Sequence, residues 1–212
     1  PDLAPRLGDP SDRIRAEAVR ALGAIGAPAL PPLVDACSSE EARIRSAAAE
    51  ALGFSAAPPP DAVRAILDRA RDGAAEVRAA ALRSLTRWGD LVPEADARAA
   101  MTENLRHEDE SVRLAAVDGF IDRPAMLPPA ADDLEALATQ EGDAAPLAAF
   151  LLGRLGAEAP SRLLRALKDD RSPVEPIAEA LARIGRPAVP ALNEAAASDS
   201  PRVRRGAVLA LG

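Results

Sequence analysis

A short pattern recurs along almost the whole chain, and it limits strongly what the chain can fold into. Residues 21–36 (ALGAIGAPALPPLVDA) and 180–195 (ALARIGRPAVPALNEA) match at most positions, with a constant offset of 159. An apolar residue followed by arginine also recurs, at Ile14-Arg15, Ile44-Arg45, Val77-Arg78, Val112-Arg113 and Val203-Arg204. With two weaker copies that end at Leu152-Gly153 and near Leu181, seven copies of 29–35 residues fill the 212-residue chain.

Each copy carries the signals of two helices. The first helix begins with proline, as at Pro28, Pro128 and Pro187. Proline suits the first turn because the N–H of a residue there has no intrahelical hydrogen-bond acceptor. A polar turn follows, and its Asp and Ser side chains are good helix N-caps. The second helix carries an apolar stripe at i, i+4, i+7, i+8 and i+11 and ends on glycine, as in residues 14–26.

One such hairpin cannot cover its own apolar stripe, so successive hairpins must stack. Alanine, the best helix former, supplies 51 of the 212 residues, and only four are aromatic, so a β-rich fold is excluded. The sequence predicts an all-α, right-handed α-solenoid of about seven two-helix repeats and about fourteen helices, forming one domain over residues 1–212. The residues predicted to be buried are Ile14, Leu22, Ile44, Leu52, Val77, Leu85, Val112, Phe120, Leu152, Leu181, Val203 and Leu211.

The motifs VRAAALRSL (77–85), IRAEAVRALGAIG (14–26) and VRRGAVLALG (203–212) resemble the HEAT-repeat family, in the short form found in phycobilin lyases. The resemblance implies that the arginine after the apolar residue joins an aspartate in the turn of a neighbouring repeat. The matching arginines are Arg15, Arg45, Arg78, Arg113 and Arg204, and the candidate acceptors are Asp9, Asp72 and Asp199. Ala145 stands in the arginine column of the fifth copy, and residues 173–175 blur the sixth, so we expect this ladder to be broken there.

The net charge and the length of the apolar runs limit the kinds of partner that the chain can have. The net charge of −7 disfavours nucleic acid or an anionic membrane as the main partner. No apolar run approaches the 18 or so residues of a membrane span. The first residue already lies in a helical pattern and the last repeat ends abruptly, so we expect a piece of a longer chain, in the cytoplasm by default.

Few residues could carry chemistry. HEAT-like deoxyhypusine hydroxylases hold two irons with several His-Glu pairs, but His107-Glu108 is the one pair here, and a metal site needs three or four ligands. His107 is therefore interpreted as an exposed turn residue. Cys37 has no histidine nearby to serve as its base, and is interpreted as a small buried thiol. Neither catalytic residue, cofactor nor metal is predicted.

The sequence thus favours a non-catalytic scaffold that presents a curved helical surface to another protein, with no small-molecule ligand. One alternative is a DNA- or RNA-binding module, for which Arg204 and Arg205 supply a basic corner. A second is a phycobilin-lyase-like chromophore binder, for which a chain without tyrosine offers a poor pocket lining.

The binding surface is predicted on the second helices, where the columns of Ala16, Glu17 and Arg20 should face outward along the concave side. Large apolar residues occupy these columns in the middle of the chain: Leu114, Leu147 and Phe150. Exposed clusters of this kind mark interaction sites. Trp88 is a weaker candidate for the same role. The alternative is a shift of register that makes Phe150 ordinary core.

Overall fold

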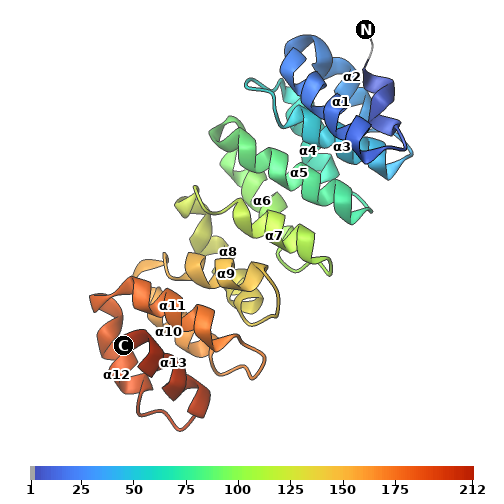
Figure 1. Cartoon of the computed structure of the whole chain (residues 1–212). Coiled ribbons are helices and arrows are strands. Elements are labelled where there is room, and N and C mark those ends of the chain that lie inside the picture. Colours follow the sequence, from blue (N-terminus) through green and yellow to red (C-terminus); the bar gives the residue numbers. More distant parts are fainter. Residues whose placement is uncertain (1–2) are drawn as a thin grey trace. The chain divides into compact units, whose positions relative to one another are not determined.

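The computed structural model describes residues 3–212, which form thirteen α-helices, six short 3-10 helices and no strand (Figure 1). The helices separate into two compact units, Pro1–Gly119 and Phe120–Gly212. The predicted all-α solenoid is confirmed. The place of a fourteenth helix is taken by the 3-10 helix η1 (Ala4–Gly8).

The first unit begins with α1, the second helix of a repeat whose first helix is replaced by η1. Three complete helical hairpins follow it. The second helices α1, α3, α5 and α7 pack side by side in one layer, and the first helices α2, α4 and α6 form the other. Their bounds are α1 Asp12–Ile25, α2 Leu30–Ala36, α3 Ala42–Leu52, α4 Pro60–Arg69, α5 Ala75–Trp88, α6 Glu94–Asn104 and α7 Glu110–Asp118.

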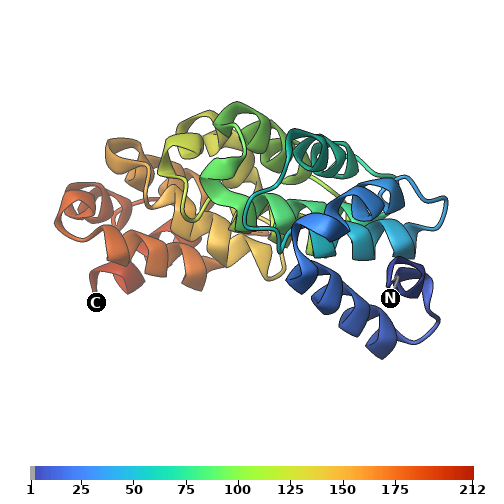
Figure 2. The same ribbon diagram turned by 90° about the horizontal axis from the view of Figure 1, so that it is seen from above.

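The second unit repeats this arrangement with three hairpins. Helix α9 packs on α8 and on α11, and α11 packs in turn on α13, while α10 lies against α8 and α12. Figure 2 shows the helices of both units from a second direction. Their bounds are α8 Leu127–Ala138, α9 Ala144–Leu152, α10 Ala159–Ala166, α11 Val174–Ile184, α12 Val189–Ala195 and α13 Pro201–Leu211.

The sequence repeat reappears as a repeat of backbone geometry. Gly26 ends α1 and Gly185 ends α11, 159 residues later, and both have φ of 71°. Glycine adopts this left-handed conformation without the steric cost that a Cβ would bring. A 3-10 turn with proline follows each glycine and leads into the next helix. The identical turn explains why the two sixteen-residue segments match.

The core follows the predicted apolar columns except at the ends. Of the predicted core, these residues are buried: Leu22, Leu52, Val77, Leu85, Val112, Phe120, Leu152, Leu181 and Val203. The prediction is wrong for Ile14 and Leu211, which are 44% and 43% exposed, and Ile44 is only half-buried. Ile14 lies on α1, which follows only the five-residue η1, whereas Val77 lies on α5, which follows the full helix α4. Leu211 is the last residue of α13.

Small residues let α3 and α5 approach closely. A Cβ added to Gly53 would overlap the Ser84 side chain and lie 3.0 Å from the Ser84 Cα. The Ser84 hydroxyl is fully buried and donates to the Ala49 carbonyl oxygen at 2.8 Å. The buried hydroxyl is thus satisfied across the helix pair, as a buried polar group requires.

The recurrent arginine has a local role that the resemblance did not imply. Each of the five donates to the carbonyl oxygen six residues earlier, in the turn of its own repeat, at 2.6–2.9 Å: Arg15, Arg45, Arg78, Arg113 and Arg204. These carbonyl groups have no helical partner, so the guanidinium satisfies them.

The implied pairing with a neighbouring repeat holds for one aspartate. Asp72 accepts from Arg45, 27 residues away, and Asn104 takes the equivalent place for Arg78. The expectation is wrong for Asp9 and Asp199. The Asp9 carboxylate lies near Arg6 of its own repeat, and Asp199 offers its backbone carbonyl to Arg204. Asp72 accepts from the arginine of the preceding repeat. Asp9 lies in the first repeat of the described residues, and the repeat before Asp199 is the one in which residues 173–175 interrupt the arginine column.

Candidate functional site: a groove between α9 and α11

A groove of about 440 Å³ runs between the second helices α9 and α11 of the second unit. Its floor is apolar, and three charged residues stand at its edge. The lining residues are Asp143, Pro146, Leu147, Phe150, Pro176, Glu179, Ala180 and Arg183. Two of them, Leu147 and Phe150, are residues that the sequence predicted for protein binding.

Helix α9 presents these two side chains because it is apolar on nearly every side. Its alanines and its two C-terminal leucines are buried: Ala144, Ala145, Ala148, Ala149, Leu151 and Leu152. Leu147 and Phe150 are left on the outward face, where Leu147 is half-buried and Phe150 is 36% exposed. Phe150 is therefore not core, and the alternative of a shifted register does not hold. Its role in binding remains a prediction.

Two of the charged residues at the edge of the groove form an ion pair on α11. The Arg183 guanidinium donates to Glu179 at 2.8 Å, one turn apart on α11, and both side chains remain more than 60% exposed. Such an exposed pair contributes little to stability and is easily reorganised. Asp143 lies at the start of α9, on the other side of the groove. Two carboxylates against one arginine give the edge a net negative charge.

Sequence reasoning missed the wall contributed by α11. Pro176, Glu179 and Arg183 carry no apolar signal in the sequence. They join the groove only because α11 packs beside α9. The proline after the turn of a repeat, at Pro146 and Pro176, is the one sequence signal common to both walls.

The structure places the two other predicted binding residues differently. Leu114 on α7, in the first unit, is 38% exposed. Trp88 is only 3% exposed, because α5 continues through it and packs it into the core. Its indole Nε1 is buried without a hydrogen-bond partner among residues 3–212. Trp88 is thus not available as a surface anchor.

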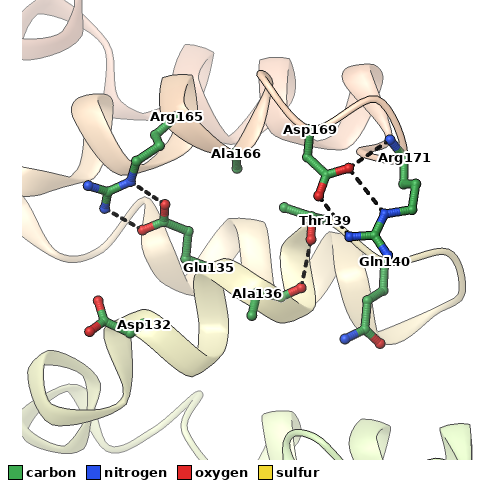
Figure 3. Close-up of a pocket in the computed structure, with 9 residues that line it drawn as sticks. All are labelled: Asp132, Glu135, Ala136, Thr139, Gln140, Arg165, Ala166, Asp169 and Arg171. Atoms are coloured by element: carbon green, nitrogen blue, oxygen red, sulfur yellow. Dashed lines mark hydrogen bonds and ion pairs between the residues drawn. The ribbon is translucent and has the colours of Figure 1, made fainter.

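A second, polar depression of about 680 Å³ lies between the first helices α8 and α10 (Figure 3). Arg165 faces Glu135 across it and donates through Nε and Nη2 to the two carboxylate oxygens. Glu135 and Asp132 also accept from Arg162, at 3.1 and 2.7 Å. At the other end, Arg171 pairs with Asp169 within the turn after α10, at 2.9 Å.

These ion pairs shift the pKa values of three of the charged groups further from neutral pH. The hydrogen bonds from Arg171 lower the pKa of Asp169 to about 2. The hydrogen bond with Glu135 raises the pKa of Arg165, and the bond with Asp132 does the same for Arg162. The ion pairs of Arg162 and Arg165 with Glu135 link α10 to α8 across the depression.

The two residues weighed for chemistry have structural surroundings. Cys37 is buried, as predicted, and burial raises the pKa of its thiol to about 12 against a smaller opposing effect of Arg69. His107 lies in a turn, as predicted, but is partly rather than fully exposed, and its Nδ1 accepts from the Asp109 amide at 3.0 Å. The imidazole thus closes the turn in the way that the Asp72 carboxylate does with the Ala74 amide.

No three His, Cys, Asp or Glu side chains within residues 3–212 are placed to bind a metal ion together. Over the same residues, every helix is too short or too polar to cross a bilayer.

Comparison with known proteins agrees with the hairpin geometry. Residues 1–86 match the family described as HEAT repeats. This segment belongs to the HEAT-repeat family. The resemblance found in the sequence is thereby confirmed. No curated protein sequence matches the chain.

Solved structures share the fold over nearly the whole chain. Importin beta aligns with a TM-score of 0.70 and 17% identity over 98% of this chain, which spans 34% of that protein. The complex of CpcE and CpcF of phycocyanin lyase from Nostoc sp. PCC7120 aligns with a TM-score of 0.56 and 22% sequence identity. The alignment covers 77% of this chain and 95% of that one. A designed armadillo repeat protein in complex with the peptide (KR)4 aligns with a TM-score of 0.50 and 16% sequence identity, over 99% of this chain and 96% of that one. These likenesses show the fold alone, a solenoid of helical repeats.

Proposed function

We propose that this chain is a non-catalytic scaffold whose groove between α9 and α11 binds a segment of another protein. The observation that carries the proposal is the exposure of Phe150 beside Leu147 in an apolar groove with an acidic edge. The segment places an apolar side chain between these two residues. A basic side chain beside it then lies near Asp143 or Glu179. The cytoplasm stays the proposed location, as the default for the sequence.

Two physical arguments support this occupant. Burying an aromatic side chain that water now contacts is the most effective single contribution to an interface. The groove is already formed by two packed helices, so binding does not require the scaffold to order itself. The net charge of −7 attracts a basic segment over a longer range. The designed relative that carries a (KR)4 peptide binds a segment of the same charge on the same class of fold.

The test is a titration with labelled twelve-residue peptides, followed by fluorescence anisotropy. One peptide carries a central leucine flanked by arginines, a second has the arginines replaced by aspartates, and a third has the leucine replaced by serine. We expect the first alone to bind, and its affinity to fall at least tenfold in Phe150→Ser and in Leu147→Ser.

The matched control is Leu209→Ser. Leu209 is an exposed leucine of the same unit, on α13, and does not line the groove. Its variant should bind like the wild type. All three variants should keep their midpoint of thermal unfolding, because surface changes cost less than about 0.5 kcal/mol. If Phe150→Ser binds the first peptide as tightly as the wild type does, the groove is not the binding site.

A further inference from the structure

An exposed aromatic residue in the first unit has an arginine stacked on it. Phe54 follows α3 directly and is 46% exposed. The Arg87 guanidinium of α5 lies over its ring, 4.5 Å from the centroid. Stacking of this kind uses the face of the guanidinium and leaves its N–H groups, which lie in the plane, free to bind.

The fold holds Phe54 in place from two sides. Gly53 packs against Ser84, which brings the next residue beside the last turn of α5. Gly23 of α1 approaches from the other side, where an added Cβ would lie 2.8 Å from the Phe54 Cβ. The ring is therefore positioned between α1 and α5, although nearly half of it faces water.

A second arginine lies one turn before Arg87 on α5. Arg83 and Arg87 are both exposed, and neither has a carboxylate oxygen within 4.0 Å among residues 3–212. Glu50, one turn before Phe54 on α3, is likewise outside that distance of both. Like charges four residues apart on a helix repel each other, and this chain has 33 acidic residues available against 26 basic ones. Two neighbouring cations left without a carboxylate are a place where a partner can supply one.

We propose that Phe54, Arg83 and Arg87 form a docking site for an acidic, apolar segment of a partner protein. A carboxylate of that segment accepts hydrogen bonds from Arg87 and Arg83, and the neighbouring apolar side chain packs against the open edge of Phe54. The planar guanidinium suits a carboxylate because two parallel N–H groups reach its two oxygens. This site is in the first unit and takes a segment of opposite charge from the one proposed for the α9–α11 groove, so neither proposal depends on the other.

The chemistry of the site favours an acidic protein segment over nucleic acid. A nucleic acid needs a row of cations that follows successive phosphates. Glu50 and Asp118 stand in the same outward column as Arg83, on the helices to either side. A single carboxylate beside an apolar group fits two arginines and one exposed ring.

The test is a selection of random twelve-residue peptides, displayed on phage, against the complete 212-residue chain. It is run in parallel against Arg83→Gln/Arg87→Gln, Phe54→Ala and the control Arg64→Gln/Arg186→Gln. The control removes the same charge from two exposed arginines that also have no ion-pair partner among residues 3–212 but lie on separate elements, α4 and η6. Enriched peptides are synthesised and titrated, and a twelve-nucleotide oligothymidylate is titrated beside them.

We expect peptides that carry Asp or Glu next to Leu, Phe or Trp, enriched by the wild type and by the control. Their affinity should fall at least tenfold in the double α5 variant and several-fold in Phe54→Ala, with unchanged circular dichroism. Three results would overturn the proposal: enriched peptides without acidic residues, acidic peptides that bind the α5 variant equally well, or no peptide that depends on these arginines. Tighter binding of the oligonucleotide, lost in the α5 variant, would assign the site to nucleic acid instead.

Discussion

Arg45 and Asp72 join two consecutive repeats through a two-pronged ion pair. The Arg45 Nε lies 2.8 Å from one carboxylate oxygen of Asp72, and Nη2 lies 2.7 Å from the other. The same guanidinium donates through Nη1 to the carbonyl oxygens of Ser39 and Glu40, both at 2.9 Å. One side chain thus closes its own turn and holds the next repeat against it.

The first prediction concerns the geometry of this arginine. Arg45→Lys keeps the charge but cannot satisfy two carboxylate oxygens and two carbonyl groups together. We expect a loss of about 1–3 kcal/mol in the free energy of unfolding, measured by urea denaturation. Arg43→Lys is the control, because Arg43 pairs with Glu41 on the surface and such pairs contribute about 0–1 kcal/mol. Equal losses in the two variants would mean that the Arg45 contacts carry no special weight.

The second prediction is a dependence of stability on pH through Asp72. Burial by itself raises the pKa of Asp72, but the hydrogen bonds from Arg45 and the Ala74 amide, with the charge of Arg69, hold it below the ordinary 3.8. A lowered carboxyl pKa stabilises the folded state above the unfolded pKa, and this contribution is lost as pH falls through the folded pKa.

The comparison of the wild type with Asp72→Asn isolates this effect. Asparagine can still accept from the arginine, as Asn104 does from Arg78 at 3.0 Å. We expect the wild type to be the more stable at pH 7, and the difference in urea midpoint to shrink as the pH falls from about 4 toward 2. A difference that stays constant over this range would show that the Asp72 charge is not coupled to folding.

The third prediction concerns the close approach of α3 and α5. Gly53→Ala places a methyl group where the Ser84 side chain and backbone stand, so the helices must separate. We expect a loss of about 1–3 kcal/mol, seen as a lower midpoint of thermal unfolding. Gly73→Ala is the control, since nothing lies within 4 Å of a Cβ added there. The double variant Gly53→Ala/Ser84→Ala tests which atoms of Ser84 are responsible. If it is as unstable as Gly53→Ala alone, the Ser84 backbone rather than its hydroxyl sets the distance between α3 and α5.

The repeat predicted the helices well because each local signal agrees with the others. Proline, turn, apolar stripe and glycine recur in order, and Gly26 and Gly185 even share their φ. The buried position of Cys37 was also predicted, from the lack of a histidine near it in the sequence. Consistency among local signals is what makes a repeat protein easy to read from its sequence.

Contacts between repeats were harder to predict. All five arginines of the column bond their own turn, and the sequence does not show which of them also reach a neighbouring repeat. Among residues 3–212, Arg45 and Arg78 do so with a side-chain acceptor. The groove was half predicted, through Leu147 and Phe150, because exposed apolar residues are visible in a helical pattern. Its other wall depends on how α11 packs beside α9, and the exposure of Phe54 depends on where α3 ends.

The last prediction separates the interior of the stack from its edge. Leu85 on α5 is fully buried, whereas Ile14, in the apolar column of the first repeat, is 44% exposed. Truncating a buried leucine removes its apolar contacts and leaves a cavity, so Leu85→Ala should cost about 2–5 kcal/mol. Ile14→Ala removes a similar volume from a site that water already reaches, and should cost less than about 1.5 kcal/mol. Urea denaturation of both variants, with the m-value checked for two-state unfolding, measures the difference. Similar costs for the two would mean that Ile14 is covered as fully as Leu85, and would restore the core position that its sequence column predicted.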